Sequence, residues 1–589
     1  MPTLSETPTE NNLALRLGDF STLSEALDYA ANGQTGFNFY SGRGELASVL
    51  SYSVLRTQAR ELAQRLIGLG LPRGARFALL AETDIDFVRF FFACQYCGLV
   101  PVPLPATVHL GGHQAMIEKL RALITACGAQ AAMATESFYD FLTEAAAGLN
   151  ITHVSEPADF DRLAQINTAL CPLDSGETAY LQYTSGSTRF PRGVVITQQA
   201  VMANLAGIIG YGLRVRPGDR CTSWLPFYHD MGLVGFLLAP LASQLSVDYL
   251  KTSDFAVRPR LWPALISRNR STISYSPTFG YALCARRMRP ADIARYDLSC
   301  WRIAGTGAEP IRPDVLDDFA QLFAAAGFKR QAFLASYGMA ECSLAISFAP
   351  LERGIEIDTI DGQKLAEKSL ATAINPEDEV TDSKKKVFCG RVLPGHELEV
   401  RDPQGRVLPE RHCGVLYVRG PSVMSGYFND PQATAEVLDA AGWLNTGDLG
   451  YLCNGQLVVT GRQKDLIIIN GRNIWPQDLE VLTEELPGIR LRDAAAFAVP
   501  ADTGEEMVVL VVQIRHPRES ERPLLVNSLR RRVREKFGTD CLVELVPPGT
   551  LPQTSSGKIS RSAARESFLQ RQQETSLQQQ VRAGGQTGR

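Results

Sequence analysis

A loop rich in hydroxyl groups is the first stretch of this sequence whose residue types suggest chemistry. It reads "YTSGSTRFPRGV", spans residues 183–194, and comes directly after an apolar run, "TAYLQY". Hydroxyls and backbone N–H groups at the end of a strand suit the oxygens of a phosphate group. The loop is not a P-loop, because it lacks the GxxxxGK(S/T) pattern. An ordinary turn rich in serine and threonine is the alternative, so the loop alone does not decide the function.

Short polar motifs that suit such a site follow in order along the chain. They are "SWLPFYHDMG" with His229 and Asp230, "GTGAEP" with Gly307, Ala308 and Glu309, "SYGMAE" with Tyr337, Gly338, Met339 and Glu341, "NTGDLG" with Asp448, "GRQKDLIIIN" with Arg462 and Lys464, and "LPQTSSGKISR" with Lys558. Taken singly, each has an ordinary explanation as a turn residue, a helix cap or a surface charge. The set is more informative than its members.

In this order, the motifs resemble those of the acyl-adenylate-forming superfamily, which includes acyl-CoA synthetases, luciferases and the adenylation domains of peptide synthetases. The resemblance covers residues 15–567. In such enzymes a carboxylate attacks the α-phosphate of ATP and expels pyrophosphate, so the site must neutralise the charge of the phosphates. The motifs offer hydrogen-bond donors for the phosphates, an acidic residue for a metal ion, an acidic residue for the ribose and a mobile cation.

The resemblance implies a role for each candidate residue. It assigns the phosphates to Thr184, Ser185, Gly186, Ser187, Thr188 and Arg192, the adenine to Gly307, Ala308, Glu309, Tyr337, Gly338 and Met339, and the ribose to Asp448 and Arg462. Glu341 and Thr184 are expected to support Mg²⁺, which prefers oxygen ligands. Lys558 is expected to bridge the substrate carboxylate and the α-phosphate of ATP.

Two further positions take their interpretation from the same resemblance. His229 corresponds to a residue near the acyl carboxylate, although a core or gating histidine is the alternative. Lys464 stands at a hinge on which a small C-terminal domain swings after adenylation, so that a thiol acceptor can enter. The chain is therefore expected to catalyse two steps with one site.

The opening loop narrows the resemblance to one branch. Superfamily members usually have glycine after the threonine and lysine before the last glycine, whereas this loop has Arg189 and Arg192. With "WLPFYHDMGL", "GAEP" and "GRNIWPQDLE", it is similar to the fatty acyl-AMP ligases, and segment 351–386 lies where this branch carries an insertion. The branch implies a medium- or long-chain fatty acid as substrate. It also implies an acyl carrier protein, or a carrier domain of a polyketide or peptide synthase, as acceptor.

Two alternatives stay open. Segment 351–386 has fifteen charged residues in thirty-six, which is also typical of a variable surface loop. In that case the chain is a fatty acyl-CoA synthetase that uses free coenzyme A. A catalytically silent acyl-AMP-binding interaction protein is the other alternative, and the joint presence of Glu341, Asp448, Arg462 and Lys558 argues against it.

The elements that must position these residues indicate an α/β fold. Amphipathic helices are predicted at residues 23–33 and 55–71, and strands at 76–81, 99–105, 131–135, 221–226, 272–277, 301–307 and 331–338. Alternating strands and helices favour mainly parallel sheets, whose ligands collect beyond the carboxyl ends of the strands. An apolar slot for an acyl chain is suggested by Leu233, Phe236, Phe279 and Tyr281, although core packing explains these residues equally well.

The domain organisation follows from breaks in this pattern. We expect a large N-terminal adenylation domain at residues 1–463, similar in fold to acyl-CoA synthetases, with the insertion at 351–386. A small, mobile α+β lid domain is expected at 464–569. The glutamine-rich end, residues 570–589, lacks apolar periodicity and is expected to be disordered.

Composition excludes several classes of protein. The chain has 589 residues, with 59 Lys and Arg against 63 Asp and Glu, and its net charge of −4 argues against bulk binding to nucleic acid. No apolar run is long enough for a membrane span, and no secretory signal is visible, so we expect a cytoplasmic protein. Its twelve cysteines suggest no disulfide framework. Cys94 and Cys97 are expected to be core thiols and not a metal or redox site.

Overall fold

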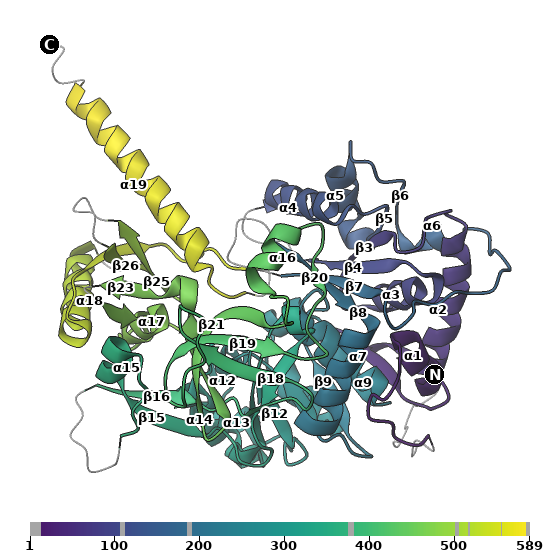
Figure 1. Cartoon of the computed structure of the whole chain (residues 1–589), viewed down its shortest axis with the longest axis horizontal. Coiled ribbons are helices and arrows are strands. Elements are labelled where there is room, and N and C mark those ends of the chain that lie inside the picture. Colours follow the sequence, from purple (N-terminus) through teal and green to yellow (C-terminus); the bar gives the residue numbers. More distant parts are fainter. Residues whose placement is uncertain are drawn as a thin grey trace.

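The computed structural model describes residues 13–106, 112–184, 191–374, 382–469, 471–500, 506–515, 519–554 and 557–584. Figure 1 shows a large body with the smaller C-terminal part packed against it at the left. Strands and helices are interleaved along the large body. The predicted fold class, a large α/β domain with a smaller C-terminal domain, is confirmed.

A nine-stranded sheet forms the centre of the large body, in the order β17-β14-β13-β12-β11-β9-β10-β1-β2. Its strands are β1 (Gly36–Tyr40), β2 (Leu46–Ser51), β9 (Arg220–Ser223), β10 (Ser246–Leu250), β11 (Ile273–Tyr275), β12 (Ile303–Thr306), β13 (Phe333–Gly338), β14 (Ala345–Phe348) and β17 (Arg391–Val392). Neighbours from β13 across to β1 pair in parallel, and the outer strands pair antiparallel. The predicted strands at 221–226, 272–277, 301–307 and 331–338 correspond to β9, β11, β12 and β13.

A second sheet is entirely parallel, in the order β4-β3-β5-β6. Its strands are β3 (Arg76–Leu80), β4 (Val100–Leu104), β5 (Ala131–Met133) and β6 (His153–Ser155), of which the first three were predicted. β4 lies at the edge of this sheet, where Pro101 and Pro103 are tolerated because they lack the N–H that a central strand needs.

Helices flank the sheets (Figure 1). Those of the large body include α1 (Leu23–Ala30), α2 (Tyr52–Ile67), α3 (Ile85–Cys97), α4 (Gly112–Cys127), α5 (Glu136–Ala146), α6 (Pro157–Asp161), α7 (Gln198–Ala206), α8 (Asp230–Leu233), α9 (Ala239–Ala242), α10 (Thr252–Val257), α11 (Leu261–Asn269), α12 (Thr278–Arg286), α13 (Pro290–Ile293), α14 (Pro313–Phe323) and α16 (Pro431–Val437). The predicted helices at 23–33 and 55–71 are α1 and α2. Cys94 and Cys97 lie in α3, where burial raises the pKa of both thiols, as expected of core residues.

Two further antiparallel sheets belong to the large body. One has the order β20-β8-β7 and contains β7 (Thr178–Tyr183), β8 (Gly193–Thr197) and β20 (Gly426–Tyr427). The other has the order β18-β19-β21-β22 and contains β18 (Glu397–Arg401), β19 (Gly414–Arg419), β21 (Leu444–Cys453) and β22 (Gln456–Arg462). The register of β21 and β22 places Asp448 opposite Arg462. This pairing brings two predicted site residues together.

The chain leaves the large body through the short helix η6 (Gln463–Asp465), which contains the predicted hinge residue Lys464. The C-terminal part holds β23 (Ile467–Ile469), β24 (Arg472–Ile474), α17 (Pro476–Glu484), β25 (Ala494–Pro500), β26 (Glu506–Gln513), α18 (Arg522–Phe537), β27 (Cys541–Val546) and α19 (Arg561–Gly584). Strands β25, β26 and β27 form one sheet, and the apolar faces of α17 and α18 pack in its core.

Residues 570–584 differ from the prediction of a disordered tail, while residues 585–589 lie outside the described residues. Helix α19 continues to Gly584 and projects away from the body in Figure 1. Glutamine, glutamate and arginine all favour a helix when no proline interrupts them. The missing apolar periodicity therefore excluded a packed face and not the helix itself.

The insertion is not wholly a surface feature, which corrects the expectation that it lies outside the core. Strands β15 (Ile357–Asp361) and β16 (Ser383–Val387) pair antiparallel, and α15 (Gly362–Lys368) lies between them in sequence. Ile360, Leu365 and Ala371 are buried in a cluster with Tyr451 and Trp475. Along β15 every second side chain is buried, but the two buried residues are Asp358 and Ile360, so the sequence of this strand does not alternate between apolar and polar residues.

Across the described part of the chain, no helix combines the length and the apolar composition that crossing a membrane requires.

Candidate active site

A cavity of about 1240 Å³ lies between the large body and the C-terminal part. It brings together predicted residues from motifs that are far apart in the sequence: Thr184, Arg192, His229, Gly307, Ala308, Glu309, Tyr337, Gly338, Met339, Glu341, Asp448, Arg462, Lys464 and Lys558. Ser185, Gly186, Ser187, Thr188 and Arg189 lie outside the described residues. Every predicted site residue that the structure describes therefore lines one cavity.

The two ends of the opening loop lie where β7 and β8 meet. The N–H of Thr184 donates to the carbonyl of Arg192 at 3.1 Å, which closes the loop at its base. The guanidinium carbon of Arg192 lies 5.1 Å from the ring centroid of Tyr427, and its nearest acidic atom, on Glu436, is 4.0 Å away. Arg192 thus presents its charge toward the cavity while stacked on an aromatic ring.

Glu341 follows β13 in the short helix η5 (Ala340–Cys342). The Tyr427 hydroxyl donates to Glu341 Oε1 at 2.9 Å. Burial raises the pKa of Glu341, while this hydrogen bond and the charge of Arg462 act in the opposite direction. Gly338 is required just before this turn, because a Cβ there would lie 1.9 Å from the carbonyl oxygen of Leu344. The backbone therefore fixes where the Glu341 carboxylate enters the cavity.

Asp448 is held by donors from two other strands. The Tyr337 hydroxyl donates to Asp448 Oδ2 at 2.7 Å, and Arg462 Nε lies 3.1 Å from Oδ1. The backbone N–H of Asp448 donates to Thr446 Oγ1 at 3.1 Å. A carboxylate oriented in this way retains lone pairs for hydroxyl donors in the cavity.

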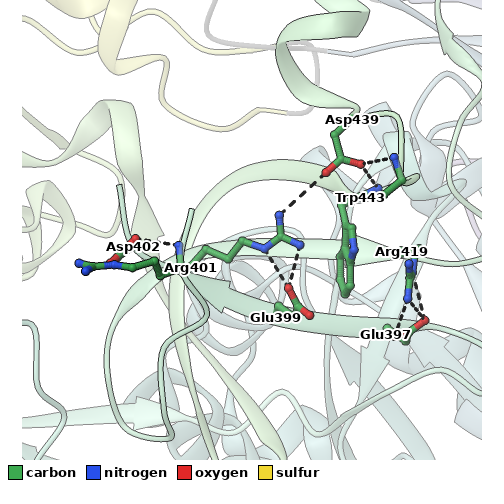
Figure 2. A network of polar contacts seen from close by, with 9 residues as sticks. Glu397, Glu399, Arg401, Asp402, Arg419, Asp439 and Trp443 are labelled. Atoms are coloured by element: carbon green, nitrogen blue, oxygen red, sulfur yellow. Dashed lines mark hydrogen bonds and ion pairs between the residues drawn. The ribbon is translucent and has the colours of Figure 1, made fainter. Parts of the chain in front are cut away.

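A cluster of arginines around a tryptophan braces the strand that carries Asp448. The guanidinium carbons of Arg401 and Arg419 lie 4.8 and 4.7 Å from the ring centroid of Trp443. Figure 2 shows the two arginines on either side of this ring, each paired with a glutamate of β18. Trp443 directly precedes β21, so the cluster fixes the start of that strand.

His229 and Asp230 stand side by side at the start of α8. His229 Nδ1 lies 2.6 Å from Asp230 Oδ1. Burial favours the neutral acid, but the neighbouring His229 and Lys558 hold the pKa of Asp230 below its usual value. No role was predicted for Asp230 from the sequence, although its position beside His229 in the motif was a usable signal.

Lys558 enters the same cavity from the C-terminal part. Its backbone N–H donates to Thr554 Oγ1 at 3.2 Å, and its carbonyl accepts from the N–H of Thr554 at 2.7 Å. Burial lowers the pKa of Lys558, whereas the charges of Asp230 and Glu309 act in the opposite direction. The lysine to which the resemblance gave a role in adenylation thus lies against the large body.

Residues 30–428 match the family described as AMP-binding enzyme. The chain belongs to this family. It is 48% identical over 564 residues, 96% of this chain and 98% of the relative, to a Caulobacter vibrioides protein described as "Putative acyl-CoA synthetase". It is 33% identical over 586 residues, 94% of this chain and 96% of the relative, to JamA of Moorena producens, a medium-chain fatty acid (acyl-carrier-protein) ligase.

A solved structure supports the same grouping. It comes from a study of fatty acyl-adenylate ligases from E. coli and L. pneumophila, and it superposes with a TM-score of 0.90 at 46% identity. The match covers 94% of this chain and 99% of that chain. The predicted superfamily and the predicted class, an ATP-dependent and AMP-forming ligase, are confirmed.

Part of the lining of this AMP-binding enzyme's cavity is apolar, and it is called the apolar arm below. Its lining includes Ile208, Leu213, Phe236, Leu344 and Phe348. Two π-helical segments, η1 (Gly207–Gly212) and η2 (Val234–Leu238), contribute residues to it. Such segments are rare in proteins, and those that occur are often found at functional sites.

The sequence candidates for an acyl slot separate in the structure. Phe236 lines the cavity, whereas Leu233 and Tyr281 are fully buried in the core. The ring of Phe279 packs under the guanidinium of Arg492. Periodicity could not distinguish these cases, because cavity wall and core are both apolar.

Several residues of the AMP-binding enzyme's site escaped the sequence analysis. The Tyr427 hydroxyl donates a hydrogen bond to Glu341, and Arg492 of the C-terminal part forms an ion pair with Glu309 of the large body. Glu309 also accepts a hydrogen bond from the N–H of Phe279 at 2.8 Å, so both carboxylate oxygens have protein partners. No sequence signal marks Tyr427 or Arg492, since their partners are distant in the chain.

Proposed function

We propose that this AMP-binding enzyme is a fatty acyl-AMP ligase. It converts a medium- or long-chain fatty acid and ATP to acyl-AMP with release of pyrophosphate, and it passes the acyl group to the phosphopantetheine thiol of an acyl carrier protein or synthase carrier domain with release of AMP. The observation that carries the proposal is a single cavity in which Lys558, Asp448 and Glu341 surround a polar centre beside an apolar arm. The fatty acid ligases among the similar proteins support the choice of substrate.

In the proposed adenylation step, each group acts on a separate part of the substrates. The Lys558 ammonium sits between the fatty acid carboxylate and the α-phosphate, where negative charge develops in the transition state. Asp448, oriented by Tyr337 and Arg462, accepts the ribose hydroxyls. Thr184, Arg192 and the loop between them hold the outer phosphates, and closure of the cavity keeps water from the acyl adenylate.

The donor set fits Mg²⁺ bound together with ATP. Within the described residues, no group of three or more acidic, histidine or cysteine side chains is arranged to hold a metal on its own. Magnesium usually takes one or two carboxylates and completes its shell with water and substrate phosphates. Glu341 would supply one carboxylate and Thr184 a hydroxyl, and both line the same cavity. When bound, the ion withdraws negative charge from the phosphates.

The choice of acceptor rests on the contacts of the insertion. Lys384 Nζ lies 2.6 Å from Asp478 Oδ2, and Lys386 Nζ lies 3.8 Å from Asp478 Oδ1. Burial favours the neutral acid, but Lys386 and Lys384 lower the pKa of Asp478. Both ammonium groups also face the ring of Trp475, at 5.0 and 5.8 Å from its centroid. These ion pairs and ring contacts thus hold the insertion against α17 of the C-terminal part.

These contacts between the insertion and α17 support a role for the insertion in selecting the acceptor. The C-terminal part must swing after adenylation for a thiol to enter, and contacts that hold it must first be broken. Both acceptors carry a phosphopantetheine arm. A carrier protein also has a docking surface whose binding can offset that cost, whereas the rest of coenzyme A is only a nucleotide. The insertion is proposed to disfavour coenzyme A in this way.

A fatty acyl-CoA synthetase is the second candidate, favoured by the name of the Caulobacter relative. One experiment separates the two. The protein is incubated with Mg²⁺, ATP and labelled dodecanoate, then with either coenzyme A or a phosphopantetheinylated carrier protein, and the products are identified by mass spectrometry. We expect acyl-carrier and little acyl-CoA, and efficient acyl-CoA formation would contradict the proposal. Deleting residues 351–386 tests whether the insertion is the barrier.

A further inference from the structure

We infer that Arg492 is a positioning residue that couples closure of the C-terminal part to the placement of the Lys558 ammonium. It joins Glu309 of the large body to the backbone that carries Lys558. The inference deepens the proposed function, because it rests on the role given above to Lys558.

The guanidinium of Arg492 makes contacts in three directions at once. One terminal nitrogen pairs with Glu309 Oε2, across the boundary between the two parts of the chain. The other, Nη1, donates to the carbonyl of Gly557 at 2.6 Å. The guanidinium carbon lies 3.8 Å from the ring centroid of Phe279 in the large body. Arg492 and Glu309 are 17% and 12% exposed, so water screens their pairing poorly.

The contact with Gly557 points to a function beyond holding two parts together. Gly557 directly precedes Lys558 and has a φ of +75°. Its carbonyl is fixed by a guanidinium that is itself anchored to the large body through Glu309. Lys558 is therefore placed relative to the large body, where ATP is expected to bind, only while Glu309 and Arg492 are paired.

The backbone at this boundary is strained on both sides. Arg492 has a φ of +69° and Ala308, next to Glu309, has a φ of +66°. Residues other than glycine rarely adopt this left-handed backbone conformation, and such outliers cluster at functional sites. The N–H of Arg492 donates to Glu484 Oε1 at 2.8 Å, while Glu484 Oε2 accepts from Arg312 at 2.8 Å. A second ion pair thus holds the same two segments together.

Arginine is specifically suited to this position. Its planar group offers several donors in fixed directions and stacks on an aromatic ring, whereas lysine offers a single point charge. Lysine at this position would retain the attraction to Glu309 and lose the simultaneous contact with Gly557. The pair of substitutions Arg492→Ala and Arg492→Lys therefore separates charge from geometry.

The first test measures adenylation alone. ATP–pyrophosphate exchange with dodecanoate is compared for wild type, Arg492→Ala, Arg492→Lys and the control Arg490→Ala, an exposed arginine of the same loop. We expect kcat to fall roughly 10- to 100-fold in Arg492→Ala, by a smaller factor in Arg492→Lys, and not in the control. Wild-type exchange in Arg492→Ala, or full exchange in Arg492→Lys, would overturn the inference.

The second test distinguishes positioning from a general loss of structure. The rate at which an amine-reactive ester labels Lys558 is measured by peptide mass spectrometry, with the other lysines as internal references. Arg492→Ala should raise the labelling of Lys558 several-fold and leave the references unchanged. If exchange falls without a change at Lys558, or if all lysines become reactive together, Arg492 is not a positioning residue.

The two proposals fail in different ways. If wild type exchanges pyrophosphate but never transfers the acyl group to a carrier, the acceptor assignment fails and the tests of Arg492 still stand. If Lys558→Ala retains full exchange, the mechanism proposed for Lys558 fails whatever Arg492 does. In a double-mutant cycle of Glu309→Gln and Arg492→Ala, the loss in the double variant should be smaller than the sum of the two single losses, and fully additive losses would contradict the coupling.

Discussion

At Lys558, burial and charge act on one ammonium in opposite directions. Burial lowers the pKa of Lys558, and Asp230 and Glu309 raise it. The net shift is downward, so the positive charge that we propose acts in adenylation is lost as the pH rises through a pKa below the ordinary one for lysine. A functional pH limit is therefore expected on the alkaline side.

The pH dependence of adenylation tests this point. For wild type, kcat/KM of ATP–pyrophosphate exchange should fall on the alkaline side through the lowered pKa of Lys558. In Lys558→Arg, whatever activity remains should extend to higher pH, because a guanidinium stays charged. An alkaline limb at the same pH in both proteins would assign it to another group. Lys558→Ala should lose adenylation almost entirely.

Tyr427 offers a second prediction at the scale of one atom. Tyr427→Phe removes the donor to Glu341 and keeps the ring on which Arg192 stacks. A hydrogen bond to a charged group contributes about 1.5–3 kcal/mol. We expect the variant to bind Mg²⁺ more weakly. The Mg²⁺ concentration that gives half-maximal ATP–pyrophosphate exchange should rise roughly tenfold. An unchanged magnesium titration would separate Glu341 from the metal.

Among the elements, the two π-helical segments shape the apolar arm. Their wider backbone turns place Ile208 and Phe236 on the cavity wall. Gly235 lies in η2 beside this wall, and a Cβ there would lie 3.4 Å from Leu344 Cδ2. A small residue at this position keeps the arm open.

Gly235→Leu should therefore change the preferred length of the fatty acid. The added side chain occupies space in the arm, and overfilled apolar sites lose about 1–3 kcal/mol. We expect kcat/KM for hexadecanoate to fall at least roughly tenfold relative to hexanoate. Gly235→Ala serves as the graded control. Equal losses for both acids would mean that the acyl chain runs elsewhere.

For the whole molecule, the insertion and the C-terminal part behave as one connected unit. The ion pairs from Lys384 and Lys386 to Asp478 and the stacking on Trp475 join them on one side. Arg472 Nη2 lies 2.6 Å from Glu367 Oε1 on the other. The swing that we propose for the second step would have to break these contacts.

Removing both lysines should release the C-terminal part. In Lys384→Ala with Lys386→Ala, the buried Asp478 carboxylate loses its counter-charges, and breaking a buried pair in this way costs about 3–5 kcal/mol. We expect cleavage near residues 463–471 by chymotrypsin, which does not cut at lysine, to speed up roughly tenfold. Lys385→Ala, exposed on the same strand, is the control. Equal cleavage rates would show that the insertion does not restrain the swing.

The order of motifs in the sequence determined the chemistry of this protein and most of its fold. Glutamate, aspartate, arginine and lysine, in that order along the chain, predict which charges meet a nucleotide, and local periodicity predicts helices and strands such as α2 and β13. Such patterns are visible because they involve neighbouring residues or residue types that the chemistry demands. Glycine at 338 belongs to the same class, since one backbone contact requires it.

Only the tertiary structure decided which side chains support those charges. Tyr427 and Glu341 are 86 residues apart, Lys384 and Asp478 are 94 apart, and Arg492 and Glu309 are 183 apart. No periodicity relates such pairs, because their contact depends on how whole elements pack. The sequence by itself thus determined what the site contains, and the packing of the C-terminal part against the large body decided how it is held.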